Sequence, residues 1–151
     1  MKKESFESKV WRWLGNWFPA YRGSGAKVIY VSSDFEDVMI KLPFNWRTKN
    51  HMGMIWGGSL YAALDPIYAV MLYKLLGYRY RVIDSEAQIR FLRPSKETLF
   101  AHFHIPKADL QALKVQLSKN GKARMNLDIS LRNSQGIVHA TCYKQIYITH
   151  S

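Results

Sequence analysis

Hydrophobic residues recur with helical spacing in two segments of the chain. Residues 5–18 form the first, and Pro19 is expected to end that helix. Residues 56–77 form the second, which predicts one long, weakly charged helix near the middle of the chain. Pro66 favours a break inside it, because proline has no N–H to donate to the carbonyl of Ala62.

In most of the remaining chain, apolar and polar residues alternate with the period of a half-buried strand. The predicted strands are residues 27–32, 37–43, 87–91, 99–105, 123–132 and 137–149. A short helix opened by Pro106 and ended by Asn120-Gly121 interrupts the last four strands. This order fits a mostly antiparallel sheet wrapped around one long central helix, an α+β fold.

The first helix allows two interpretations. Its apolar residues share one face: Phe6, Val10, Trp13, Leu14 and Trp17. Such a basic, tryptophan-rich helix could lie on a membrane. We prefer the interpretation that the helix packs across its own domain.

Length and composition indicate one folded domain. The chain has 151 residues, of which 48% are hydrophobic and 14% aromatic, so intrinsic disorder is excluded. We divide it into an N-terminal amphipathic helix, residues 1–19, and a main domain, residues 20–151. A single cysteine, Cys142, excludes an internal disulfide framework and a cysteine-based zinc knuckle. It alternates with apolar neighbours, so we interpret it as core.

The charge balance points to an anionic partner. Lys and Arg total 22 against 11 acidic residues, a formal charge of +11. The partner could be nucleic acid, a phospholipid surface or a phosphorylated small ligand. No helix-turn-helix, zinc-finger or RNA-recognition motif is present, which disfavours nucleic acid.

The chain shows no sign of export or of a membrane span. Charged residues interrupt the N-terminal apolar stretch that a secretion signal would need. The longest weakly charged run, residues 52–73, contains Asp65, Pro66 and two glycines, so we expect a buried helix there. We therefore expect a cytoplasmic protein.

The segment from Asn50 to Asp65 carries a family resemblance. Asn50, Gly53, Gly57, Gly58 and Asp65 match, in type and spacing, the signature of the hotdog-fold acyl-CoA thioesterases of the phenylacetate-pathway type. In that family, however, a histidine usually stands where this chain has a tryptophan directly before the glycine pair. The aromatic residue and the run Asp65-Pro66-Ile67-Tyr68 are more similar to a hotdog branch called the tetrameric acyl-CoA thioesterases, as are Ile83-Asp84, Ile89-Arg90-Phe91 and Arg93-Pro94.

The resemblance implies hydrolysis of an acyl-CoA at a site shared between two subunits. The amide of Gly58 would polarise the thioester carbonyl, and Asp65 would act as base or nucleophile. Seven residues separate the two, roughly 10 Å along a helix, so one carbonyl needs Gly58 of one subunit and Asp65 of the other. The alternatives are that Gly57-Gly58 permits tight packing and that Asp65 caps a helix restarting at Pro66.

Further residues take roles from the same resemblance. Asn50 would orient water or substrate, or else form a turn. Gly57, Trp56 and Asp84 would lie at the substrate. Arg90 and Arg93 would bind the phosphates of coenzyme A, and Lys96, Lys122 and Arg124 would flank strands that border the same channel.

We expect no cofactor and no metal. His102 and His104 share one strand face, but no third ligand follows at suitable spacing. We also expect a homodimer that assembles to a tetramer. Because Trp56 replaces the usual histidine, a hotdog protein that binds acyl-CoA or lipid without turnover stays open as an alternative.

Overall fold

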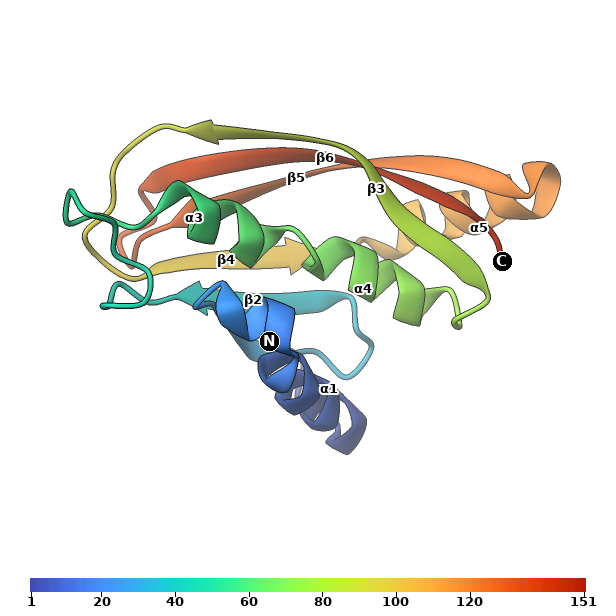
Figure 1. The fold of residues 1–151 in the computed structure, drawn as a ribbon. Coiled ribbons are helices and arrows are strands. Elements are labelled where there is room, and N and C mark those ends of the chain that lie inside the picture. Colours follow the sequence, from blue (N-terminus) through green and yellow to red (C-terminus); the bar gives the residue numbers. More distant parts are fainter.

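The computed structural model describes residues 1–151 and contains a six-stranded antiparallel sheet that curves around two consecutive helices (Figure 1). The strands are β1 Lys27–Val31, β2 Asp37–Leu42, β3 Tyr80–Phe91, β4 Leu99–His104, β5 Lys122–Arg132 and β6 Val138–His150. The helices are α1 Phe6–Trp17, α2 Pro19–Gly23, α3 Gly57–Leu64, α4 Ile67–Leu75 and α5 Lys107–Asn120. The sheet order is β1-β2-β4-β5-β6-β3, which confirms the expected α+β architecture.

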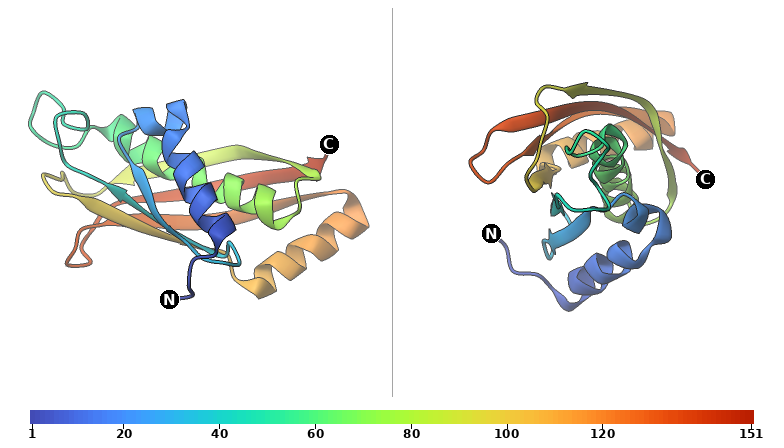
Figure 2. Two further views of the ribbon diagram at one scale, coloured as in Figure 1. Left: turned by 90° about the horizontal axis from the view of Figure 1, so that it is seen from below. Right: turned by 60° about the vertical axis from the view of Figure 1, so that its left-hand side comes forward.

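The long helix is divided at Pro66. Helix α3 ends at Leu64 and α4 begins at Ile67, as the missing N–H of proline predicts. The two helices run end to end along the inner face of the sheet, and Figure 2 shows the sheet wrapping around them. Their inner residues, Leu64 and Leu72 among them, are fully buried against strand residues such as Ile40 and Ile146.

Two local predictions were incomplete. Pro19 ends α1, but it also begins the short helix α2, because its fixed φ suits a first helical position. Strand β3 begins at Tyr80, well before the alternation from Ala87 to Phe91 that predicted it. The early part of β3 pairs with β6 from Tyr80↔His150 onward, so tertiary pairing extends the strand beyond its local pattern.

The two edge strands of the sheet differ in whether other parts of the chain bond their free backbone groups. Helix α1 lies against β1, where the Asn16 side chain donates to the Val28 carbonyl at 2.9 Å and accepts from its N–H at 2.8 Å. The Glu4 carboxylate accepts from the N–H of Val31 at 3.0 Å. These bonds use backbone groups with which a further strand would pair. Strand β3, at the other edge, pairs only with β6.

Helix α1 is amphipathic and packs on its own domain, as expected, but its apolar stripe is not the face that is buried. Its only fully buried residue is Ser8, and the tryptophan that faces inward is Trp11, against Phe35 at 5.9 Å between ring centroids. Much of the apolar stripe stays exposed: Phe6 is 85% exposed and Trp13 59%. Asn16 and the other side chains that bond β1 lie on the opposite face, so this face sits on the sheet. No helix in the structure combines the length and apolar character needed to cross a bilayer.

Candidate active site

Helix α3 begins with Gly57 and Gly58, and the side chain before them does not cap the helix. Trp56 is the N-cap residue and has extended backbone angles, and its side chain makes no hydrogen bond to the first amides. The first bond of the turn runs from Leu60 N–H to the Trp56 carbonyl at 3.1 Å. The amides before Leu60 have no intrahelical partner and lie at the positive end of the helix dipole.

Aromatic side chains explain why glycine occupies both positions. A Cβ on Gly58 would stand 2.5 Å from the Trp56 indole, so any larger residue would displace that ring. A Cβ on Gly57 would stand 3.4 Å from the Phe91 ring, at the end of β3. The glycines thus allow Trp56 and Phe91 to pack closely on the start of the helix, whose first amides have no side-chain cap.

Asp65, at the end of α3, belongs to a charged cluster with a buried lysine. Lys144, on β6, has a side chain with 0% exposure. Its ammonium donates to Asp65 Oδ1 at 2.9 Å and to Asp84 Oδ2, on β3, at 2.6 Å. It also donates to the backbone carbonyl of Asp65. The cluster thus brings together two predicted site residues, Asp65 and Asp84, through a third that sequence reasoning missed.

The helix break explains why the ammonium can reach the backbone of Asp65. In a continuous helix, the carbonyl of Asp65 would accept from the residue four positions on. Instead, Pro66 interrupts the helix, and the carbonyl accepts from Lys144. A buried carbonyl needs a donor, and here a charged one provides it.

The environment shifts the pKa values of the two carboxyl groups in opposite directions. Burial by itself would raise the pKa of Asp65, but hydrogen bonds from Lys144 and Tyr61 outweigh it and hold the pKa below its ordinary value. Burial raises the pKa of Asp84, and the bond from Lys144 offsets this only in part. The Oδ1 atom of Asp84 is buried and has no hydrogen-bond partner. Asp65 is therefore the carboxylate that stays ionised most readily.

The capping alternative for Asp65 is wrong. Its backbone is helical and it ends α3, while Pro66 precedes α4 without any side-chain cap. The Asp65 carboxylate instead accepts from the Tyr61 hydroxyl at 2.8 Å, one turn earlier, as well as from Lys144. Its side chain is 41% exposed, so it remains open to a ligand.

Asn50 shapes the loop that leads to α3. Its side-chain Oδ1 accepts from the N–H groups of Met52 at 3.0 Å and Met54 at 3.2 Å. Its N–H donates to the Met54 carbonyl at 2.8 Å. This is the turn-forming alternative, and the carboxamide oxygen is already used within the loop.

The basic residues considered for a phosphate site fall at two ends of the sheet. Arg90 pairs with Thr141 and, like Arg93, lies near the Phe91 end of β3, close to the start of α3. Arg124, on β5, lies across β6 from Ile83, because both pair with Tyr147. Ile83 and Arg90 are seven residues apart along β3. That offset amounts to roughly 23 Å. Lys96 also lies near the glycine end, because the carbonyl of its neighbour Ser95 accepts from the Ile55 N–H at 2.8 Å.

His102 and His104 share a partner that sequence reasoning also missed. His102 Nε2 and His104 Nδ1 each lie 2.8 Å from Asp37 Oδ1, on the neighbouring strand β2. The histidine side chains are 56% and 49% exposed. No group of three or more His, Cys, Asp or Glu side chains is placed to hold a metal ion. Cys142 is buried as expected, and burial raises the pKa of its thiol.

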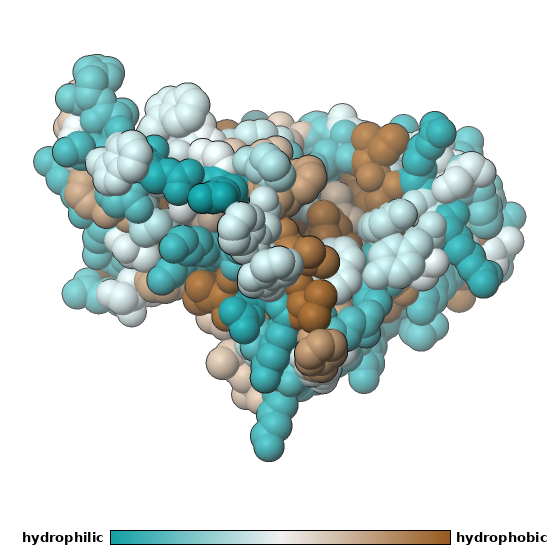
Figure 3. All heavy atoms as spheres, turned by 60° about the horizontal axis from the view of Figure 1, so that its bottom comes forward, coloured by the Kyte–Doolittle hydropathy of each residue, from teal (hydrophilic) through white to brown (hydrophobic).

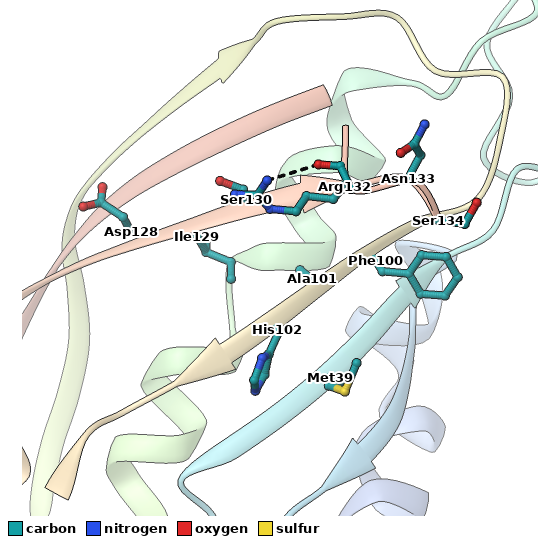
Figure 4. A pocket seen from close by; sticks show the side chains of 11 residues that line it. Met39, Phe100, Ala101, His102, Asp128, Ile129, Ser130, Arg132, Asn133 and Ser134 are labelled. Atoms are coloured by element: carbon teal, nitrogen blue, oxygen red, sulfur yellow. Dashed lines mark hydrogen bonds between the residues drawn. The ribbon is translucent and has the colours of Figure 1, made fainter. Parts of the chain in front are cut away.

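Strands β4 and β5 separate over most of their length and form a hollow. They share one paired position, Phe100↔Arg132, so a space of about 520 Å³ opens beside it (Figure 4). Asp128, Ser130 and Arg132 border it, and Arg132 donates to the Gly136 carbonyl at 3.2 Å. None of the predicted site residues lines this hollow.

A family model described as a domain of unknown function, DUF4442, matches residues 9–148. The chain belongs to the DUF4442 family. No curated protein sequence matches this DUF4442 chain.

Solved structures share the fold of this DUF4442 protein. A protein of unknown function from Pseudomonas aeruginosa, described as a probable thioesterase, has a TM-score of 0.84 at 22% identity, over 95% of each chain. A protein of unknown function from Chlorobaculum tepidum has a TM-score of 0.78 at 16% identity, over 95% of this chain and 93% of that one. A thioesterase from Haemophilus influenzae has a TM-score of 0.70 at 14% identity, over 99% of this chain and 94% of that one. These similarities confirm the hotdog fold.

Proposed function

We propose that this DUF4442 protein hydrolyses acyl-CoA thioesters with water. One observation carries the proposal: a carboxylate held ionised by a buried lysine ends the same helix that begins with a glycine pair whose amides have no side-chain cap. The names of the solved structures with this fold, thioesterases among them, agree with that chemistry. We further propose that the protein acts on acyl-CoA in the cytoplasm.

The start of α3 would bind the thioester carbonyl. The amide of Gly58 is placed to donate to the carbonyl oxygen, and its effect grows when that oxygen becomes negative in the tetrahedral intermediate. The Trp56 and Phe91 rings pack close to the two glycines, so no larger residue fits at Gly58 without displacing the indole. Asn50 contributes by shaping the loop that ends at Trp56.

Asp65 would activate the attacking water, or attack the carbonyl itself. A base must be deprotonated before it can act, and the bonds from Lys144 and Tyr61 favour the ionised form. Lys144 is a positioning residue in this proposal, because it is fully buried and acts through Asp65. Asp84 holds the other side of the ammonium and borders the substrate.

The site would be completed by a second subunit through β3. Gly58 and Asp65 are seven residues apart on one helix, roughly 10 Å, so they do not meet the same carbonyl in one chain. The β1 edge is occupied by Asn16 and Glu4, whereas the twelve-residue β3 edge is open to antiparallel pairing with a copy of itself. We propose a homodimer paired along β3, assembled further to a tetramer.

The test is hydrolysis by purified protein across acyl-CoA substrates of two to sixteen carbons. Arg90 and Arg93 would bind the phosphates, so Arg93→Gln should raise KM for acyl-CoA about tenfold and leave hydrolysis of a thioester without the nucleotide unchanged. Lys122→Gln, at the other end of the sheet, is the matched control. Absence of turnover with every chain length would overturn the proposal.

A second candidate function is binding of acyl-CoA without hydrolysis. The Trp56 indole lies directly over Gly58, in the place of the histidine usual in the phenylacetate-pathway family. Saturable acyl-CoA binding by calorimetry, combined with no thiol release, would favour this candidate.

A further inference from the structure

The apolar stripe of α1 stays largely exposed in the fold. Trp17 is 58% exposed, Leu14 52% and Val10 38%, in addition to Phe6 and Trp13. The residue that follows, Phe18, is 62% exposed. A contiguous set of large apolar side chains on one helix face is unusual for a surface that stays in water.

The helix is attached through its other face. The Ser8 hydroxyl donates to the Ser5 carbonyl and is buried, and Asn16 bonds the backbone of β1. Gly15 also faces the sheet, because a Cβ there would stand 3.8 Å from the Val28 side chain. Small and polar side chains thus fix α1 in an orientation that presents its apolar stripe outward.

The charges around the stripe are positive. Both acidic residues of the segment are neutralised within the domain: Glu4 pairs with Arg12 at 2.9 Å, and Glu7 pairs with Lys74. Lys3 and Lys9 have no acidic partner. The Arg22 guanidinium lies over the Trp17 ring at 5.3 Å from its centroid.

The same face contains an apolar groove. It has a volume of about 370 Å³ and runs between α1 and α4, with Leu14 and Phe18 on one side and Val70 and Tyr73 on the other. Figure 3 shows brown apolar side chains gathered in a hollow at the centre of the face that its view brings forward. The exposed stripe and the groove share Leu14, and Phe18 directly follows the helix.

We propose that α1 docks on the surface of an anionic phospholipid bilayer. The stripe enters the boundary between headgroups and acyl chains, where tryptophan side chains are favoured, and Lys3 and Lys9 lie at the phosphates. At twelve residues, about 18 Å, α1 is too short to span a bilayer and lies in its plane.

Charge complementarity favours lipid over a second copy of this chain. Two α1 stripes packed on one another would bring Lys3 and Lys9 of both copies together, on chains that each carry +11. An anionic bilayer instead supplies the opposite charge along the whole helix. The proposal is independent of the proposed hydrolysis, since it uses no residue of the Asp65 cluster.

The experiment is co-sedimentation of the full chain with vesicles of phosphatidylcholine, with and without phosphatidylglycerol. We expect binding to the anionic vesicles and little to phosphatidylcholine alone. The double variant Trp13→Ser with Trp17→Ser should bind at least about tenfold more weakly. Trp46→Ser is the matched control, because Trp46 is 84% exposed but lies in the loop after β2.

A second pair of variants tests the charge. Lys3→Gln with Lys9→Gln should weaken binding to anionic vesicles about 30-fold. Lys107→Gln with Lys114→Gln on α5 removes the same charge elsewhere and should reduce binding much less. Thermal unfolding at the wild-type temperature would show that the variants are folded, as expected for exposed side chains.

Two results would overturn the proposal. One is wild-type protein that does not co-sediment with anionic vesicles. The other is a tryptophan double variant that binds them as tightly as the wild type. If the stripe instead joins two copies, the double variant would sediment at a lower mass than the wild type, and neither protein would bind vesicles.

Discussion

Two carboxylate clusters on this molecule differ in how far water reaches their cationic partners. In one, Lys144 is fully buried and bonds both Asp65 and Asp84. In the other, Asp37 lies between His102 and His104, whose side chains are about half exposed. The hydrogen-bond lengths are similar in the two, between 2.6 and 2.9 Å.

The two clusters show that burial, not bond length, sets how strongly the charges in such a cluster interact. Water screens the interaction of an exposed pair, which contributes about 0–1 kcal/mol. A buried ammonium has lost its hydration, so it requires both carboxylates, and its hydrogen bonds favour their ionised forms against the effect of burial. The shifted pKa values lie at Lys144's two partners, where a proposed catalytic residue also lies.

The largest expected effect is on stability. Lys144→Met removes the ammonium and leaves Asp65 and Asp84 facing one another without a cation. We expect the free energy of unfolding to fall by about 3–5 kcal/mol. Urea denaturation measures it. His102→Gln, in the exposed cluster, is the control and should change it by less than about 1 kcal/mol. A Lys144→Met variant as stable as the wild type would show that the desolvation of the lysine cancels the value of its bonds.

The next effect is on turnover. Asp65→Asn keeps an oxygen for Lys144 and Tyr61 but removes the base, so kcat should fall about 100-fold or more. The unfolding temperature should fall less than in Lys144→Met, because Asp84 still pairs with the ammonium. Asp37→Asn is the matched control in the exposed cluster and should leave kcat unchanged. Equal kcat in Asp65→Asn and wild type would leave Asp65 a purely structural role.

A smaller effect appears in the pH dependence of stability. The pKa of Asp65 is lowered from 3.8 on folding, so its stabilising contribution is complete above about pH 4 and is lost as the pH falls through the folded value. The pKa of Asp84 is raised from 3.8, so its ionisation opposes folding as the pH rises above that value. Thermal unfolding between pH 2.5 and 7 should therefore show Asp65→Asn least different from wild type at the acid end. The unfolding temperature of Asp84→Asn, relative to that of the wild type, should be highest at the neutral end. The reverse order would contradict the opposite shifts.

The smallest effect concerns the exposed cluster. Asp37→Asn should lower the free energy of unfolding by no more than about 1 kcal/mol, since both histidines remain accessible to water. Raising the salt concentration should shrink the difference further. A loss as large as that expected for Lys144→Met would remove the distinction between the two clusters.

Much of the fold follows from local patterns in the sequence. Alternation predicts most of the strands, and helical spacing predicts α1, the central helix and α5. The break at Pro66 depends only on the missing N–H of proline. The glycine pair at the start of α3 and the acidic residue seven positions later are likewise visible in the sequence, and so is the resemblance to hotdog thioesterases.

Tertiary structure decided which charges meet and which faces are covered. Lys144 lies 79 residues from Asp65 and 60 from Asp84, and in the sequence it is one more basic residue on an alternating strand. Only the packing of β6 between β5 and β3, under the helix break, removes it from water. For α1, periodicity gathers the apolar residues on one face, but the hydrogen bonds of Asn16 with β1 turn that face outward. Local periodicity is set within a few residues, whereas burial is set by the elements that the whole chain brings together.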